Sequence, residues 1–190
     1  PAFVLLFLVY HFFTTSDLFR SYFSRLRDSN KGEVLRVLLM RASFVVLIGL
    51  VPLVALLSAG SMSLRWLRVA PLLSLRSLLW VVGIAGGMSL FALLVRNSPG
   101  AQRNYPIIRA IQWTPATHAV NVVGWVFYLA AYEFAYRGYI LFLTAEALGV
   151  WPAIAVSVAL YAALHIPRGA GEALGCIPMG VVFAVAALHS

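Results

Sequence analysis

The stretch SLLWVVGIAGGMSLFALLV, residues 77–95, contains no charged side chain and is flanked by Arg76 and Arg96. A helix needs about 20 apolar residues to cross the hydrocarbon core of a bilayer. A charge at the bilayer centre costs about 2.5–3.5 kcal/mol on insertion scales, so charges are expected to stop at the ends of a span. Residues 77–95 therefore predict a transmembrane helix.

Further uncharged runs repeat this pattern along the chain, at residues 42–64, 110–132, 147–164 and 173–190. The run from Pro1 to Ser16 is shorter and has no basic residue before it, so it predicts the tail of a helix and not a signal peptide. The chain opens on proline and stops inside an apolar run, and we expect a fragment at both ends. The predicted fold class is all-α, a multi-pass transmembrane helical bundle.

The composition indicates the same class. Hydrophobic residues make up 62% of the chain and charged residues 11%, and the mean hydropathy is +0.92. A soluble domain carries about 25% charged residues. The net charge of +8 comes from basic residues placed between apolar runs, which is typical of loops that flank membrane spans and not of a nucleic-acid-binding face. The single cysteine, Cys176, excludes an internal disulfide within this sequence.

The charged connections suggest a division of the chain. Residues 17–41 form a basic loop with six basic and three acidic side chains, which the positive-inside rule would place in the cytoplasm. Residues 65–76 and 96–109 each carry three arginines as well, so the orientation stays open. We expect N-terminal transmembrane helices over residues 1–112, including this loop, and a second segment over residues 113–190.

The sequence EFAYRG, residues 133–138, supplies the first candidate site. Glu133 and Arg137 are four residues apart, which places both on one face of an α-helix. Ionisable groups near membrane depth indicate function by default, although such a pair could also lock helix packing. His165 follows at the end of the next apolar run, and Pro167 ends that helix just beyond it. A glutamate near a histidine in a dry bundle can polarise a water for hydrolysis.

Several other kinds of site have no counterpart in the sequence. The zinc-binding pattern H-E-x-x-H, the nucleophile pattern G-x-S-x-G and the phosphate-binding glycine loop do not occur. We therefore predict no cofactor, while a divalent metal stays open. Glu146 is expected to be solvated at a helix end, and Glu172 beside glycines is expected to be solvated or to line the site.

The sequence YEFAYRG, residues 132–138, resembles the first motif, EExxxR, of the CPBP intramembrane endopeptidases. This family includes the type II CAAX prenyl proteases and bacteriocin-processing or self-immunity proteins. Residues 161–165, YAALH, are similar to the second motif, FxxxH, with tyrosine for phenylalanine. The resemblance covers roughly residues 113–190 and implies that this segment is a catalytic core, which we expect to be truncated at the C-terminus.

The resemblance implies a catalytic set of Glu133, Arg137 and His165. Glu133 falls on the second glutamate of the first motif, and Tyr132 stands where the family has its water-activating first glutamate. The third motif, a histidine followed four residues later by asparagine, is expected beyond Ser190, with His189 in the loop before it.

The predicted function is hydrolysis of a peptide bond in a membrane-associated or prenylated-type substrate. Glu133 would activate the water, His165 would orient it or stabilise the oxyanion, and Arg137 would hold Glu133 ionised. The expected partners are membrane lipid and a peptide or protein substrate, without nucleic acid, and the expected location is a bacterial cytoplasmic membrane. The alternatives are a catalytically inactive relative that binds a membrane partner, as an immunity protein does, and a proton-relaying transporter, for which repeated halves are missing.

Overall fold

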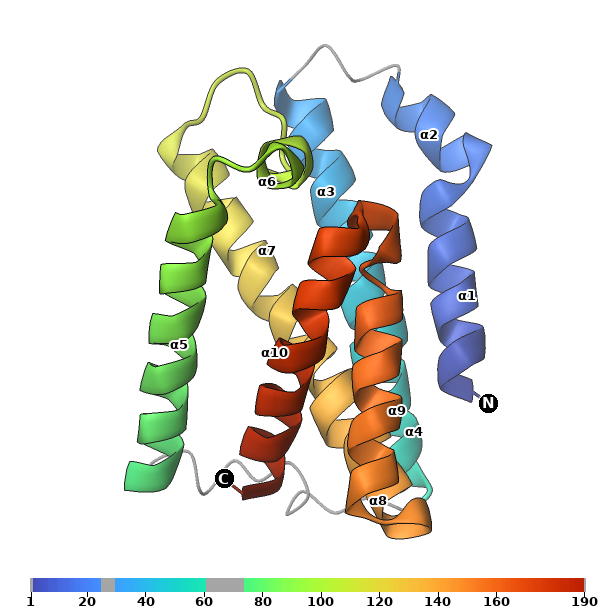
Figure 1. The fold of residues 1–190 in the computed structure, drawn as a ribbon. Helices are drawn as coiled ribbons and strands as arrows, with labels where there is room; N and C mark the ends of the chain where they lie inside the picture. The colour runs from blue at the N-terminus through green and yellow to red at the C-terminus, as the bar shows by residue number, and fades with distance from the viewer. Residues whose placement is uncertain (1, 25–29, 61–73, 190) are drawn as a thin grey trace. The chain divides into compact units, whose positions relative to one another are not determined.

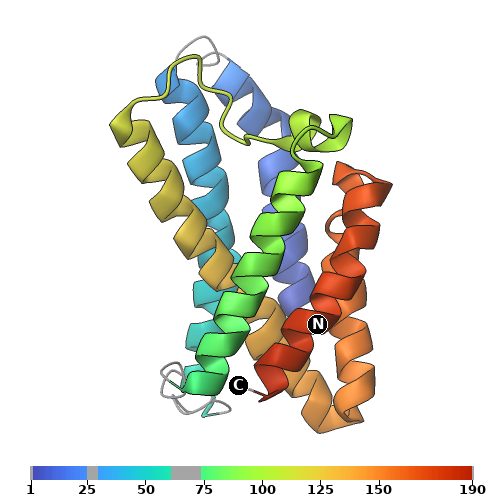
Figure 2. The ribbon, with the colours of Figure 1, turned by 60° about the vertical axis from the view of Figure 1, so that its left-hand side comes forward.

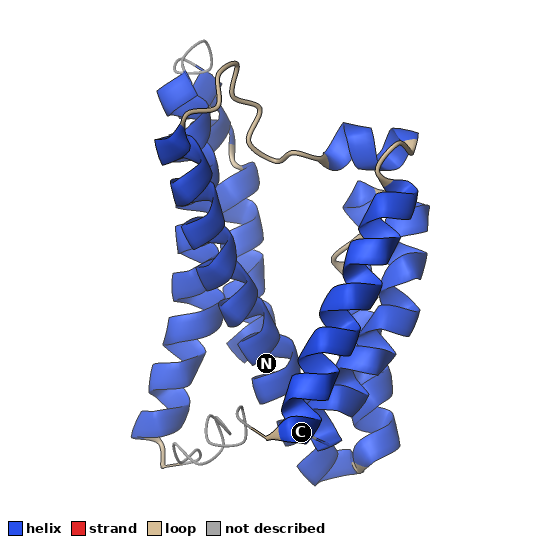
Figure 3. Cartoon of the chain, turned by 90° about the vertical axis from the view of Figure 1, so that its left-hand side faces the viewer, coloured by secondary structure: helices blue, strands red, loops and turns tan. Residues whose placement is uncertain are grey.

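The structure is a computed structural model, and it describes residues 2–24, 30–60 and 74–189 (Figure 1). Within these ranges the chain forms helices, turns and loops but no strand, as Figure 3 shows. The prediction of an all-α fold is therefore confirmed. The expectations for Arg25, Arg27, Arg65 and Arg68, and for the two terminal residues, fall outside the described residues.

The elements follow one another as α1 (Ala2–Thr15), α2 (Asp17–Ser24), α3 (Asn30–Phe44), the π-helix η1 (Val45–Leu50), α4 (Val51–Ser58), α5 (Leu75–Val95), α6 (Pro99–Asn104), α7 (Pro115–Glu133), the π-helix η4 (Phe134–Ile140), α8 (Leu141–Leu148), α9 (Val150–Ala163), the 3-10 helix η5 (Ile166–Arg168) and α10 (Ala170–His189). In the described part, four helices are long and apolar enough to cross a membrane: Lys31–Ser58, Leu75–Val95, Val150–Arg168 and Ala170–His189. A bent pair, Phe3–Thr15 with Asp17–Phe23, would add a fifth.

The structure differs from the sequence-based prediction at two helices. The first span begins at Lys31, so α3 extends the helix back through much of the basic segment 17–41. The run 110–132 does form a helix, α7, but α7 is not among the four candidate spans. Its first half carries polar side chains, including His118 and Asn121, which lower its hydropathy.

The described helices fall into two compact units, and we describe each by itself. The first contains Pro1–Ser61 and Pro106–Ala135, and the second contains Met62–Tyr105 and Tyr136–Ser190. In the first unit, α3 and α7 lie side by side (Figure 2). Phe44 packs between them, with its ring centroid 4.6 Å from that of Tyr128.

Arg41 connects these two helices through polar contacts. It is only 3% exposed although it lies inside the span Lys31–Ser58. Its Nη1 donates to the backbone oxygen and the Oδ1 of Asn121, at 3.0 and 3.1 Å, and its guanidinium lies 4.6 Å from the ring centroid of Trp125. A Cβ on Gly124 would stand 3.1 Å from Nη1, so glycine leaves the room that the guanidinium occupies. The polar residues of α7 thus lower the cost of burying this charge.

The second unit is organised around the antiparallel pair α9 and α10, drawn side by side in orange and red in Figure 1. Leu141, Ala153 and Ala184 are fully buried in its core. Gly149 has φ +88°, a left-handed conformation that favours glycine and lets the chain turn directly from α8 into α9. On α10, a Cβ at Gly180 would meet Val158 at 3.2 Å, so α9 and α10 approach closely there.

Candidate active site

The first motif lies where an α-helix changes into a π-helix. Glu133 is the last residue of α7 and is partly buried, and Arg137 lies within η4. The sequence predicted an α-helix through both residues, whereas the structure widens the helix immediately after Glu133. Single π-helical turns are rare and occur often at functional sites. Glu133 belongs to the first unit and Arg137 to the second.

Arg137 is accommodated by aromatic rings. It is 6% exposed, and its guanidinium carbon lies 4.6 Å from the ring centroid of Tyr161 and 5.0 Å from that of Phe183. The ring of Tyr136 is 5.8 Å away. A desolvated cation over a ring gains about 2 kcal/mol from the negative ring face. The three rings therefore offset part of the cost of burying the arginine.

The second motif places His165 in the turn that follows α9. Its Nδ1 lies 2.9 Å from the backbone oxygen of Tyr161, one helical turn earlier. A carbonyl oxygen can only accept, so Nδ1 must carry the hydrogen of this bond. In the neutral imidazole Nε2 is then an acceptor. The backbone thereby selects one tautomer of His165.

Tyr161 connects Arg137 with His165. Its ring centroid lies 5.0 Å from that of His165, its ring contacts the Arg137 guanidinium, and its carbonyl accepts from His165. A Cβ at Gly180 would stand 3.4 Å from the Tyr161 ring, so the close approach of α10 supports the ring from behind. Two of the three predicted site residues, Arg137 and His165, are therefore brought together through a common neighbour.

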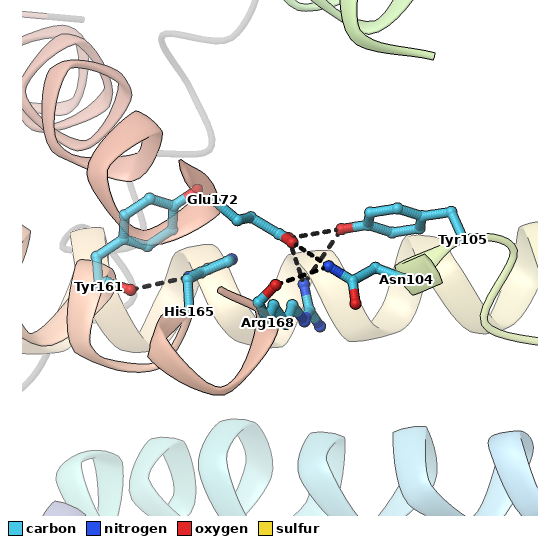
Figure 4. A network of polar contacts seen from close by, with 6 residues as sticks. All are labelled: Asn104, Tyr105, Tyr161, His165, Arg168 and Glu172. Atoms are coloured by element: carbon cyan, nitrogen blue, oxygen red, sulfur yellow. Dashed lines mark hydrogen bonds and ion pairs between the residues drawn. The ribbon is translucent and has the colours of Figure 1, made fainter. Parts of the chain in front are cut away.

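A polar network lies beside the turn that carries His165 (Figure 4). Glu172 accepts hydrogen bonds from Asn104 Nδ2, Tyr105 Oη and Arg168 Nη1, at 2.9, 2.9 and 3.2 Å. Asn104 Nδ2 also donates to the backbone oxygen of Arg168, and Arg168 Nη1 donates to Tyr105 Oη. Withdrawal of the phenol from water raises the pKa of Tyr105, an effect that the charge of Arg168 opposes. The phenol is therefore protonated at neutral pH and acts as a donor to Glu172.

Sequence reasoning did not find this network. The spacing of Arg168 and Glu172, four residues apart, is the one available signal, because it favours an ion pair on a helical turn. Asn104 and Tyr105 lie more than 60 residues earlier and carry no motif.

The other candidate residues have ordinary surroundings. Tyr132 is 7% exposed and its ring stacks on Phe44, with centroids 5.8 Å apart, so a packed aromatic ring fills the position of the family's first glutamate. Glu146 is exposed on α8, as expected. His118 lies against Trp113, with ring centroids 4.8 Å apart. Among the described residues, no three histidine, cysteine or acidic side chains gather closely enough to hold a metal ion.

Comparison with known proteins bears on the same part of the chain. Residues 114–190 match the family model described as type II CAAX prenyl endopeptidase Rce1-like. The matched range includes Glu133, Arg137 and His165. Searches of curated proteins and of solved structures gave no match. Residues 114–190 are therefore similar to the type II CAAX prenyl endopeptidases of the Rce1-like family.

Proposed function

We propose that this chain is an intramembrane endopeptidase that hydrolyses a peptide bond of a membrane-associated or prenylated-type substrate. The observation that supports this most strongly is the contact chain from Arg137 through Tyr161 to His165, which lies inside the segment that matches the family. Two motifs separated in sequence meet at one aromatic ring, as a shared site requires.

Glu133 is proposed as the general base. In this mechanism its carboxylate takes a proton from a water molecule, and the water oxygen bonds to the carbonyl carbon of the substrate. The C–N bond then breaks, and the leaving nitrogen takes the proton back from Glu133. The phenol of Tyr132 is a poor base at neutral pH because an ordinary tyrosine pKa is about 10. Glu133 is the carboxylate of the motif, and it is partly buried next to the π-helical turn.

The tautomer of His165 supports one of its two expected roles. With the hydrogen on Nδ1, a neutral His165 presents Nε2 as an acceptor. Such a nitrogen can accept a hydrogen bond from the attacking water and so orient it. Stabilising an oxyanion would instead require a hydrogen on Nε2. We therefore assign His165 to orientation of the water.

Arg137 is proposed to keep Glu133 ionised and in position. A guanidinium favours the charged form of a nearby carboxylate. The aromatic rings around Arg137 attract its guanidinium through their negative faces. Because the rings carry no formal charge, they do not neutralise the positive charge of Arg137.

The second candidate function is that of an inactive relative that binds a membrane partner. The observation that favours it is the packed ring of Tyr132 on Phe44, since this ring leaves the first glutamate position without a carboxylate.

A cleavage assay in liposomes, with a prenylated CAAX-type peptide and the full-length protein, distinguishes these functions. Glu133→Gln keeps the shape of the side chain but removes the proton acceptor, and we expect the rate to fall by about 10²–10⁴-fold. Glu146→Gln is the matched control, because Glu146 is exposed on α8, and it should retain full activity. Wild-type activity that survives Glu133→Gln would show that the base lies elsewhere. A wild type without activity would favour the inactive relative.

A further inference from the structure

The turn that carries His165 is tied to a distant segment of the second unit. The 3-10 helix η5 follows His165, and Arg168 N donates to the backbone oxygen of His165 at 2.9 Å. Gly169, with φ +115°, then turns the chain into α10. The peptide of Arg168 is held from outside this turn, because Asn104 Nδ2 donates to its oxygen at 2.9 Å. The end of α6 thus supports the backbone next to His165.

Glu172 is the centre of these contacts. Its Oε1 accepts from Tyr105 and Arg168, and its Oε2 accepts from Asn104. Both oxygens are therefore engaged, which suits Glu172 to holding its neighbours and not to taking a proton from water. The side chain of Glu172 is 24% exposed and that of Arg168 is 34% exposed. Partly exposed ion pairs add little to stability, so the main effect of this network is on position.

We propose that Glu172 is a positioning residue for His165, acting through Arg168 and held by Asn104 and Tyr105. The imidazole itself contacts Tyr161, whereas the backbone that follows it leaves α9 and turns at Gly169, and the network holds this backbone. Figure 4 shows the His165 side chain between Tyr161 on one side and the Glu172 network on the other. The backbone of Tyr161 selects the tautomer, and the network keeps the turn in the place where that hydrogen bond can form.

The expected loss of activity rests on the proposed function, whereas the expected change in the tautomer of His165 does not. A displacement of about 1 Å in a catalytic group can lower a rate about 100-fold. Glu172→Gln removes the ion pair with Arg168 and leaves one acceptor oxygen for three donors. We expect kcat to fall about 10-fold to 100-fold, with KM nearly unchanged.

A second readout follows the imidazole directly. Nitrogen-15 NMR of the full-length protein with labelled histidine, in micelles, reports which ring nitrogen carries the hydrogen. The His165 signals are assigned by their loss in His165→Asn. We expect the Nδ1–H form in the wild type and a mixture of both tautomers in Glu172→Gln.

The chain offers a matched control in its first unit. Glu33 accepts from Arg36 Nε and Nη2, both at 2.9 Å, and from the backbone nitrogen of Arg109 at 3.1 Å. It is therefore also a partly buried carboxylate that ties a loop to a helix. Glu33→Gln should leave kcat and the His165 tautomer unchanged.

The outcomes separate this proposal from the proposed function. If Glu172→Gln keeps both the kcat and the Nδ1–H form of the wild type, the positioning role is overturned. If the wild type has no peptidase activity but Glu172→Gln still mixes the tautomers, the positioning role stands and the proposed function fails. If Glu172→Gln does not fold, Tyr105→Phe removes one hydroxyl from the same network. Tyr105→Phe should shift the tautomer in the same direction, and the absence of any shift would overturn the proposal.

Discussion

Arg137 illustrates how a cation can be buried in an apolar bundle when aromatic rings take the place of water. Three rings lie within 6 Å of its guanidinium carbon, and two of them, Tyr161 and Phe183, come from α9 and α10. A guanidinium is planar and weakly hydrated, so it stacks on ring faces, whereas an ammonium group is compact and strongly hydrated. The rings around Arg137 therefore suit a guanidinium better than an ammonium group.

The first prediction at this scale concerns that specificity. Arg137→Lys keeps the charge but loses the planar stacking, so we expect peptidase activity to fall at least 10-fold while the protein still accumulates in the membrane. The measurement is the liposome cleavage rate normalised to protein abundance. Arg96→Lys, at an exposed arginine, is the control. Unchanged cleavage in Arg137→Lys, with reduced abundance in Arg137→Ala, would mean that the arginine serves only to stabilise the fold.

The sequence singled out Glu133, Arg137 and His165 as candidates, but it gave no indication of their surroundings. Glu133, Arg137 and His165 are conspicuous because ionisable groups are rare in apolar runs, and the chemistry of hydrolysis requires such groups. The neighbours that hold them are not conspicuous. Phe183 is one apolar residue of a run, and Asn104 is one polar residue of a segment that carries no motif. Only the folded chain brings these side chains together.

At the scale of elements, hydrophobic runs predicted where helices form but not how each helix is built. The run 42–64 contributes to a helix that begins at Lys31 and includes the π-helix η1. The sequence shows no signal for η1 or η4, because a π-helix differs from an α-helix by one hydrogen-bond register and not by composition. Likewise α7 is helical as predicted, but the sequence did not indicate that Asn121 on α7 accepts a hydrogen bond from the buried Arg41 on α3.

The prediction at this scale tests the packing of η1 on α7. A Cβ at Gly49 would stand 2.9 Å from the Cβ of Ala131, which is closer than side chains approach in folded proteins. Gly49→Ala must therefore push the two helices apart, and overpacking of this kind costs about 1–3 kcal/mol. We expect a clear fall in the thermal unfolding temperature in detergent.

Gly83→Ala provides the comparison for that measurement. In the described part of the chain, apart from the adjacent residues and the nearby backbone of α5 itself, no atom lies within 4 Å of a Cβ built at Gly83. Alanine is also the better helix former, so this variant should unfold at or slightly above the wild-type temperature. Equal unfolding temperatures for the two variants would contradict the close approach of η1 and α7.

At the scale of the whole molecule, the exposed apolar surface is explained by a lipid environment. Helix α5 carries no charged side chain from Ser77 to Val95, and most of its side chains are exposed. In water such a surface would be unfavourable, by about 25 cal/mol for each Å² of apolar area. In a bilayer the lipid chains cover it. Composition therefore predicted the class of the protein. Contacts such as that between Tyr105 and Glu172, which are 67 residues apart, could be found only in the folded structure.

Cys176 gives a test of the folded second unit as a whole. It is the one cysteine of the sequence, it lies on α10, and it is 7% exposed. A thiol reagent can reach it only when α10 separates from its neighbours, so its labelling rate measures opening of this unit. We expect labelling by a maleimide in mild detergent to be at least 100-fold slower than in denaturing detergent. The control is Gly100→Cys with Cys176→Ser, since Gly100 is exposed and a Cβ there meets no atom of the described residues within 4 Å. This cysteine should react equally fast in both detergents, and equally fast labelling of Cys176 would contradict the packing of α10.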